Sequence, residues 1–128
     1  MKVYVVGNLL VKQDSLPIRL LPRLKRELPN IDFVEFDPTE DFPKEKQLII
    51  VDTVLDIKRV ILLKDINKIQ LNKVCSLHDF DMGYNLKLMK KFKLIDNVWI
   101  IGVPEKISEK KAVQQIKEVI TNLSSKSV

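Results

Sequence analysis

Short apolar runs separated by polar stretches recur along the chain. The first run ends at Gly7-Asn8, a typical turn pair, and Ile31–Phe36 alternates between apolar and polar residues as a half-buried strand does. Leu48–Val51 is a continuous apolar run, as expected for a strand buried on both faces. The pattern predicts strands at 2–6, 31–36, 48–51, 60–63 and 97–103.

Two of the polar stretches carry apolar residues at helical spacing. Leu20, Leu24 and Leu28 recur four residues apart behind Ser15, a good N-cap, although Pro22 should kink this helix. A second amphipathic helix is expected after Ser108, with a buried side made of Val113, Ile116, Val119, Ile120 and Leu123. A third is expected from about residue 76 or 79 to residue 92.

The alternation of strands and helices predicts the fold class. It indicates an α/β protein, a three-layer α/β/α sandwich around a mainly parallel sheet of about five strands. The length of 128 residues fits a single domain, residues 1–128, and 45% hydrophobic residues suffice for a core.

The composition excludes several kinds of site. One cysteine cannot build a disulfide framework, and one cysteine with one histidine cannot close a Cys/His zinc site. Any Ser–His or Cys–His catalytic pair would have to use His78. The chain also lacks the His-Glu-x-x-His helix of zinc hydrolases.

No stretch of the sequence reads as a targeting or membrane segment. A single lysine precedes the first apolar run, unlike a signal peptide, and all apolar runs fall far short of the ~20 residues that span a bilayer. We therefore expect a cytoplasmic protein without a membrane partner.

The net charge of +5 raises the question of an anionic partner. Most lysines are interspersed with acids, as on a solvated helix face. The only cluster is Lys87, Lys90, Lys91 and Lys93. A solvated surface is the favoured interpretation, and a nucleic-acid or acidic-partner binder is the alternative, which predicts steeply salt-dependent affinity.

Polar residues follow the predicted strands. In parallel α/β sheets, ligands bind outside the carboxyl ends of the strands. The residues that follow those ends are Asn8, Asp14, Asp37, Asp52 and, after a longer connection, His78. Carboxylates with an imidazole suit a borderline divalent metal such as nickel, zinc, manganese or iron.

Each of these residues also has an ordinary structural interpretation. Asp14 would suit a helix N-terminus, Asp37 before Pro38 suits a turn, and a lone His78 is commonly a structural histidine. Asp52 is harder to explain in this way, because a carboxylate at a buried strand end needs a partner.

Four segments occur in an order that resembles a known family. They are Gly7-Asn8-Leu9-Leu10 with Asp14, the strand ending in Asp52-Thr53, Ser76-Leu77-His78-Asp79, and Ile101-Gly102-Val103-Pro104-Glu105. Together they resemble the maturation endopeptidases of nickel–iron hydrogenases, over almost the whole chain.

The resemblance implies a protease that removes the C-terminal extension of a nickel–iron hydrogenase large-subunit precursor after nickel insertion. It implies that Asp14, Asp52 and His78 contact the metal and act in catalysis, and that Asn8 and Asp37 contact the substrate. The nickel would be carried by the substrate. Whether an aspartate is the general base or only a ligand stays open.

The sequence departs from the family at one position. Many members have Asp-Gly-Gly after the second strand, whereas this chain has Asp37-Pro38-Thr39-Glu40. Because the glycine-rich stretch is linked to substrate recognition, the departure concerns the target hydrogenase. The alternative to a protease is a non-catalytic nickel-loading checkpoint or chaperone-like binding protein on the same fold.

Overall fold

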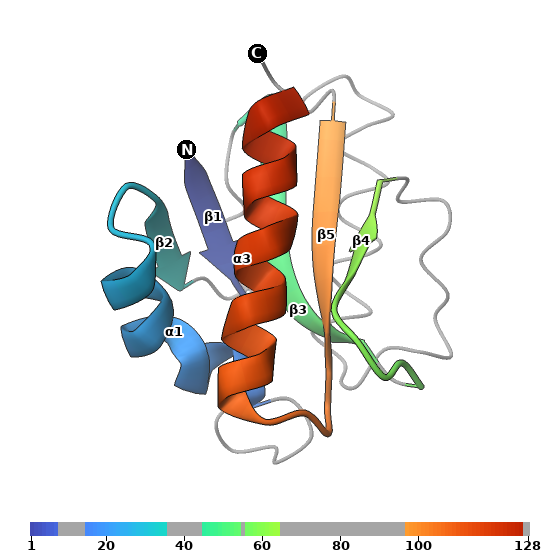
Figure 1. Cartoon of the computed structure of the whole chain (residues 1–128). Helices are drawn as coiled ribbons and strands as arrows, with labels where there is room; N and C mark the ends of the chain where they lie inside the picture. Colours follow the sequence, from blue (N-terminus) through green and yellow to red (C-terminus); the bar gives the residue numbers. More distant parts are fainter. Residues whose placement is uncertain (8–14, 36–44, 55, 65–96, 127–128) are drawn as a thin grey trace.

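The computed structural model describes residues 1–7, 15–35, 45–54, 56–64 and 97–126 (Figure 1). These residues form one five-stranded sheet in the order β2-β1-β3-β5-β4. Four strands are parallel and β4 runs antiparallel to β5. The prediction of an α/β fold with a mainly parallel sheet of about five strands is confirmed. The strands are β1 (Lys2–Val5), β2 (Asp32–Glu35), β3 (Gln47–Val54), β4 (Ile61–Leu63) and β5 (Asn97–Pro104).

The short connection after β3 explains why β4 is antiparallel. A parallel crossover needs a dozen or more residues, and only residues 55–60 separate the two strands. The chain therefore reverses direction and adds β4 beside β5. The main-chain N–H of Val60 donates a hydrogen bond of 2.8 Å to Gln115 Oε1, which fastens the start of this strand to the C-terminal helix.

The central strands are longer than the apolar runs that predicted them. β3 and β5 pair over their whole lengths, from Gln47 opposite Asn97 to Val54 opposite Pro104. The prediction that β3 stops at Asp52 was wrong, because the partner strand continues and gives Asp52 and Thr53 a ladder to join. Pro104 closes β5, and a proline is tolerated where the ladder ends.

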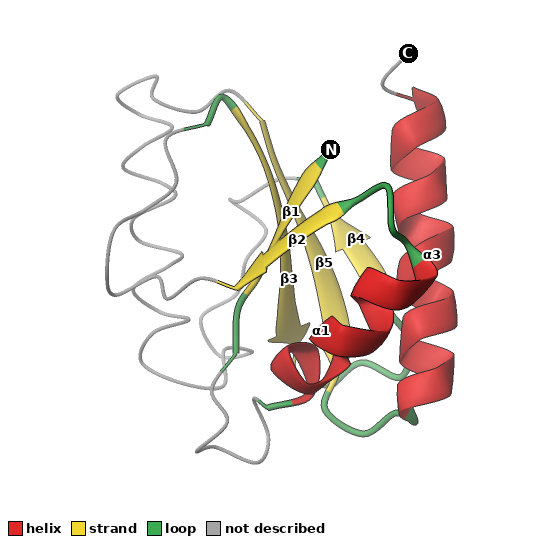
Figure 2. Cartoon of the chain, turned by 90° about the vertical axis from the view of Figure 1, so that its left-hand side faces the viewer, coloured by secondary structure: helices red, strands yellow, loops and turns green. Residues whose placement is uncertain are grey.

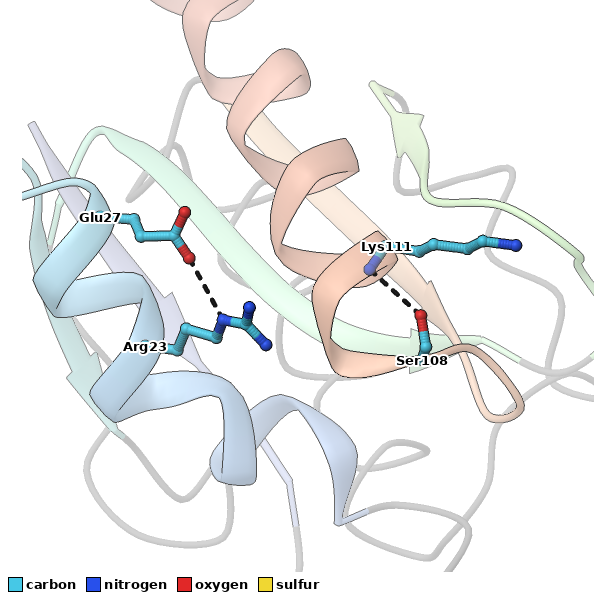
Figure 3. Close-up of polar contacts among 4 residues, drawn as sticks. All are labelled: Arg23, Glu27, Ser108 and Lys111. Atoms are coloured by element: carbon cyan, nitrogen blue, oxygen red, sulfur yellow. Dashed lines mark hydrogen bonds and ion pairs between the residues drawn. The ribbon is translucent and has the colours of Figure 1, made fainter.

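Helix α1 (Leu16–Glu27) begins after Ser15, as predicted. The Ser15 side chain makes no capping bond; its Oγ instead accepts a hydrogen bond of 3.2 Å from Arg19 Nε. The helix continues through Pro22. On its surface, Arg23 Nε donates to Glu27 Oε2 at 3.3 Å, one helical turn further on (Figure 3).

Helix α3 (Glu109–Lys126) begins at the predicted cap. Ser108 Oγ accepts a hydrogen bond of 3.2 Å from the main-chain N–H of Lys111, which satisfies one of the free donors of the first turn (Figure 3). The predicted apolar side is confirmed, with Val119 partly buried and the other four members buried.

Both described helices cover the same face of the sheet (Figure 2). Because side chains alternate along a strand, β1, β3 and β5 each contribute residues to two cores. The core under α1 and α3 includes Val3, Val5, Val51, Ile101 and Val103. The core on the opposite face contains Tyr4, Val6, Leu48, Ile50, Val98 and Ile100.

The third predicted helix, residues 76–92, lies outside the described residues, so the second helical layer stays a prediction. Neither α1 nor α3 is long and apolar enough to cross a membrane, nor is any other helix in the described part of the chain.

Candidate functional site at the carboxyl ends of the strands

The four parallel strands, β2, β1, β3 and β5, end at the same edge of the sheet, where α1 and α3 begin (Figure 1). The ladder between β1 and β3 continues past β1, because the N–H of Val6 donates to the carbonyl oxygen of Val51 at 2.9 Å. The chain thus leaves β1 along β3, toward the carboxyl edge. In a parallel sheet, this edge is where ligands bind.

Asp52 is the predicted site residue that lies within the described part of the chain. It stands in β3, between β1 and β5, and is only 3% exposed. Its side chain lies on the face away from α1 and α3, because it alternates with Val51, which packs in the core under those helices. A buried carboxylate therefore lies near the carboxyl end of the central strand, as the sequence predicted.

The Asp52 carboxylate has a hydrogen-bond donor in its own strand. The main-chain N–H of Thr53 donates to Asp52 Oδ1 at 2.8 Å, and the bond is buried. A buried charge is costly unless polar groups compensate it, and this N–H supplies part of that compensation. The bond also fixes the orientation of the carboxylate relative to β3.

Thr53 itself was not singled out by sequence reasoning. Its side chain is 3% exposed and lies on the α1 and α3 side of the sheet. Its Oγ1 has no hydrogen-bond partner among the residues that the structure describes. The signal available in the sequence was a threonine directly after a candidate ligand at the end of an apolar strand.

Gly102 lies beside Asp52 in the register of β3 and β5. A Cβ added at Gly102 would lie 2.7 Å from Val54 Cγ2 and 3.2 Å from Ile61 Cγ1. The absence of a side chain at this position thus lets β3 and β4 pack closely on either side of β5. An isolated glycine inside an apolar strand is a sequence signal for such a close approach.

The other predicted site residues lie outside the described residues. They are Asn8, Asp14, Asp37 and His78. The lysine cluster at 87–93 also lies outside the described residues. Among the described residues, no group of three or more histidine, cysteine, aspartate or glutamate residues is placed to hold a metal ion. The described structure therefore positions one predicted ligand, Asp52, and leaves the set of three a prediction.

Comparisons with known proteins give matches at the level of structure. No protein-family model matches the sequence, and no curated protein matches it. The [NiFe] hydrogenase maturation protease HybD from Thermococcus kodakarensis superposes with a TM-score of 0.64 at 21% identity, over 96% of this chain and 99% of that one.

Two Escherichia coli structures are also similar. The hydrogenase maturating endopeptidase HybD has a TM-score of 0.63 at 17% identity, over 95% of this chain and 93% of its own. The solution structure of an endopeptidase has a TM-score of 0.53 at 17% identity, over 81% and 74% of the two chains. At these identities the likeness establishes a common architecture. The chain has the fold of the hydrogenase maturation proteases over nearly its whole length.

Proposed function

We propose that this protein is an endopeptidase of hydrogenase maturation, which removes the C-terminal extension of a nickel–iron hydrogenase large-subunit precursor. The observation that carries the proposal is the buried Asp52 carboxylate, oriented by the Thr53 N–H at the carboxyl end of the central strand. The shared fold with maturation proteases supports the same reaction class.

Peptide hydrolysis requires a polarised carbonyl group, an activated water molecule and a proton for the departing amine. In the proposal, Asp52 contacts the nickel that the precursor carries, together with Asp14 and His78. Two carboxylates and an imidazole are a suitable donor set for that metal. The metal belongs to the substrate, and its charge would polarise the carbonyl group or the attacking water.

Thr53 contributes through its main chain. Loss of a group that orients a metal ligand typically lowers metal affinity or activity by about 10- to 100-fold. Because the 2.8 Å bond comes from the backbone N–H, the orientation of Asp52 depends on β3 remaining paired with β5 at this point. The strand ladder is thus the element that holds the proposed ligand in place.

The test is a maturation assay with the nickel-loaded and the nickel-free precursor, followed by the mass of the precursor C-terminus. We expect the wild-type protein to release a short C-terminal peptide from the loaded precursor alone. Asp52→Asn and His78→Ala are expected to lower the cleavage rate by about 100-fold, because each removes a proposed ligand.

Asp56→Asn is the matched control. Asp56 is exposed, lies four residues after Asp52 and has a φ of 63°, a conformation that asparagine accepts readily. This variant should cleave at the wild-type rate. Cleavage by Asp52→Asn at the wild-type rate would contradict the proposal. Binding of the loaded precursor without any loss of mass would support the checkpoint or chaperone-like alternative instead.

A further inference from the structure

A groove lies at the end of the sheet opposite Asp52. Residues from the amino ends of β1, β3 and β5 line it, together with residues from the C-terminal part of α3. Two adjoining hollows, of about 350 and 260 Å³, share Gln47, Trp99 and Leu123 as lining residues. We refer to the two hollows together as the Trp99 groove.

Trp99 gives the groove its chemical character. It is the only tryptophan of the chain, and it is half-buried, whereas the next two residues of β5 are buried. Ile49 and Leu62, both partly buried, add further apolar lining. Half-buried aromatic side chains in apolar hollows are the usual anchors of protein–protein contacts.

The rim of the groove carries a net positive charge. Lys64 is exposed and forms no ion pair with any residue in the described part of the chain. Lys2 Nζ lies 3.9 Å from Glu45 Oε1, and that carboxylate also accepts a hydrogen bond of 2.6 Å from Tyr4. The rim therefore has two lysine ammonium groups and one side-chain carboxylate, which is already engaged by Tyr4.

Amide side chains complete the lining. Gln47 and Asn97 are both exposed at the groove. A side-chain amide offers hydrogen-bond donors and an acceptor, which are the groups that a peptide main chain requires of its partner. An apolar floor, flanking amides and a cationic rim together favour a peptide over a small apolar molecule.

We propose that the Trp99 groove binds a peptide segment of a partner protein in which an apolar side chain is flanked by carboxylates. The apolar side chain packs on Trp99, and the carboxylates face Lys64 and Lys2. Gln47 lies about 16 Å along β3 from Asp52, so such a peptide would occupy a surface separate from the carboxyl edge. The inference goes beyond the proposed protease activity and does not depend on it.

The test uses defined peptides and the fluorescence emission of Trp99. All tryptophan emission comes from the groove, because the chain has no other tryptophan. The probe is a capped pentapeptide with a Glu-Leu-Glu centre. A Glu-Ala-Glu peptide removes the anchor, and a Lys-Leu-Lys peptide reverses the charge. We expect the probe to cause a saturable change in Trp99 emission at concentrations up to about 1 mM. The other two peptides should bind at least about fivefold more weakly.

A charge reversal in the protein tests the orientation of the peptide. Lys64→Glu should lower the affinity for the probe about fivefold and raise the affinity for the Lys-Leu-Lys peptide, because the rim charge then attracts lysines. Lys117→Glu makes the same charge change on the exposed surface of α3, outside the groove lining, and should leave both affinities unchanged.

Three results would overturn the inference. The first is the absence of a saturable response to the probe. The second is equal binding of all three peptides. The third is an equal effect of Lys64→Glu and Lys117→Glu, which would indicate general electrostatic attraction instead of a site. Circular dichroism of each variant verifies that the fold is intact, and none of these results bears on cleavage of a precursor.

Discussion

Asp52 on β3 and Gly102 on β5 are paired residues of the parallel ladder, so the buried carboxylate has a residue without a side chain as its neighbour. The space that a side chain at Gly102 would fill is occupied by Val54 and Ile61. The close packing around the proposed ligand thus involves three strands, and it depends on a glycine at one position.

Gly102→Ala should destabilise the protein by about 1–3 kcal/mol, because the new methyl group would lie 2.7 Å from Val54 Cγ2. The measurement is chemical unfolding of the wild type and the variant. In the proposed protease the variant should also cleave more slowly, because relief of the contact shifts the end of β3 that carries Asp52.

Val54→Ala provides the control for this clash. It removes the atom that the added Cβ would contact, so the double variant should lose less stability than the sum of the two single variants. Strict additivity of the two single changes would show that Gly102 is required for a different reason.

Thr53→Val should stabilise the protein by about 1 kcal/mol. The substitution removes a buried hydroxyl group that has no hydrogen-bond partner among the described residues, and it retains the side-chain shape. The bond from the Thr53 main chain to Asp52 is kept, so proteolysis should be unaffected. Thermal unfolding and the precursor assay measure the two effects.

Thr121→Val is the comparison for the Thr53 substitution. Thr121 is exposed on α3, and its hydroxyl donates to the Lys117 carbonyl oxygen at 2.8 Å. The same chemical change should therefore bring no gain in stability there. A loss of stability in Thr53→Val would mean that the buried hydroxyl is satisfied, for example by a buried water molecule.

Tyr4 should titrate at unusually high pH. Burial raises its pKa from 10.0 to about 12, and the hydrogen bond to Glu45 contributes in the same direction. Absorbance at alkaline pH measures the titration. In a Tyr84→Phe background the signal comes from Tyr4 alone, because the chain has two tyrosines. A midpoint near 10 would contradict the prediction.

The same pKa shift predicts how stability changes with pH. The pKa of Tyr4 is higher in the folded protein than in the unfolded chain. The contribution of Tyr4 to the free energy of unfolding is therefore complete below pH 10.0 and is lost as the pH rises to about 12. Tyr4→Phe should therefore lose stability less steeply than the wild type across this range. Parallel unfolding curves of the two proteins would exclude a role for this hydroxyl group.

Ser108→Ala should lower the free energy of unfolding by about 1 kcal/mol, because it removes the acceptor that caps the Lys111 N–H at the start of α3. Denaturant unfolding measures the loss. Ser108→Asp keeps an acceptor at the same position and adds a charge that favours a helix N-terminus, so it should retain the stability of the wild type. Equal losses in both variants would show that the cap contributes little.

Within the described residues, local patterns were enough to predict most of the secondary structure. The buried Leu20 and Leu24 of α1, the apolar stripe of α3 and the Ser108 cap are all features of neighbouring residues, and the structure confirms them. The boundaries of β3 were not predicted correctly, because a strand extends as far as its partner continues. The partner, β5, lies more than forty residues further along the chain.

The sequence by itself determined the fold class and the presence of a carboxylate, Asp52, near the carboxyl end of the central strand. Tertiary structure alone decided the strand order, the antiparallel β4, the packing at Gly102 and the burial of a Thr53 hydroxyl that has no hydrogen-bond partner among the described residues. It also decided that Gln47, Trp99 and Leu123 line one groove. The physical reason is that pairing, burial and hydrogen bonding between distant segments depend on proximity in space, which local periodicity does not encode.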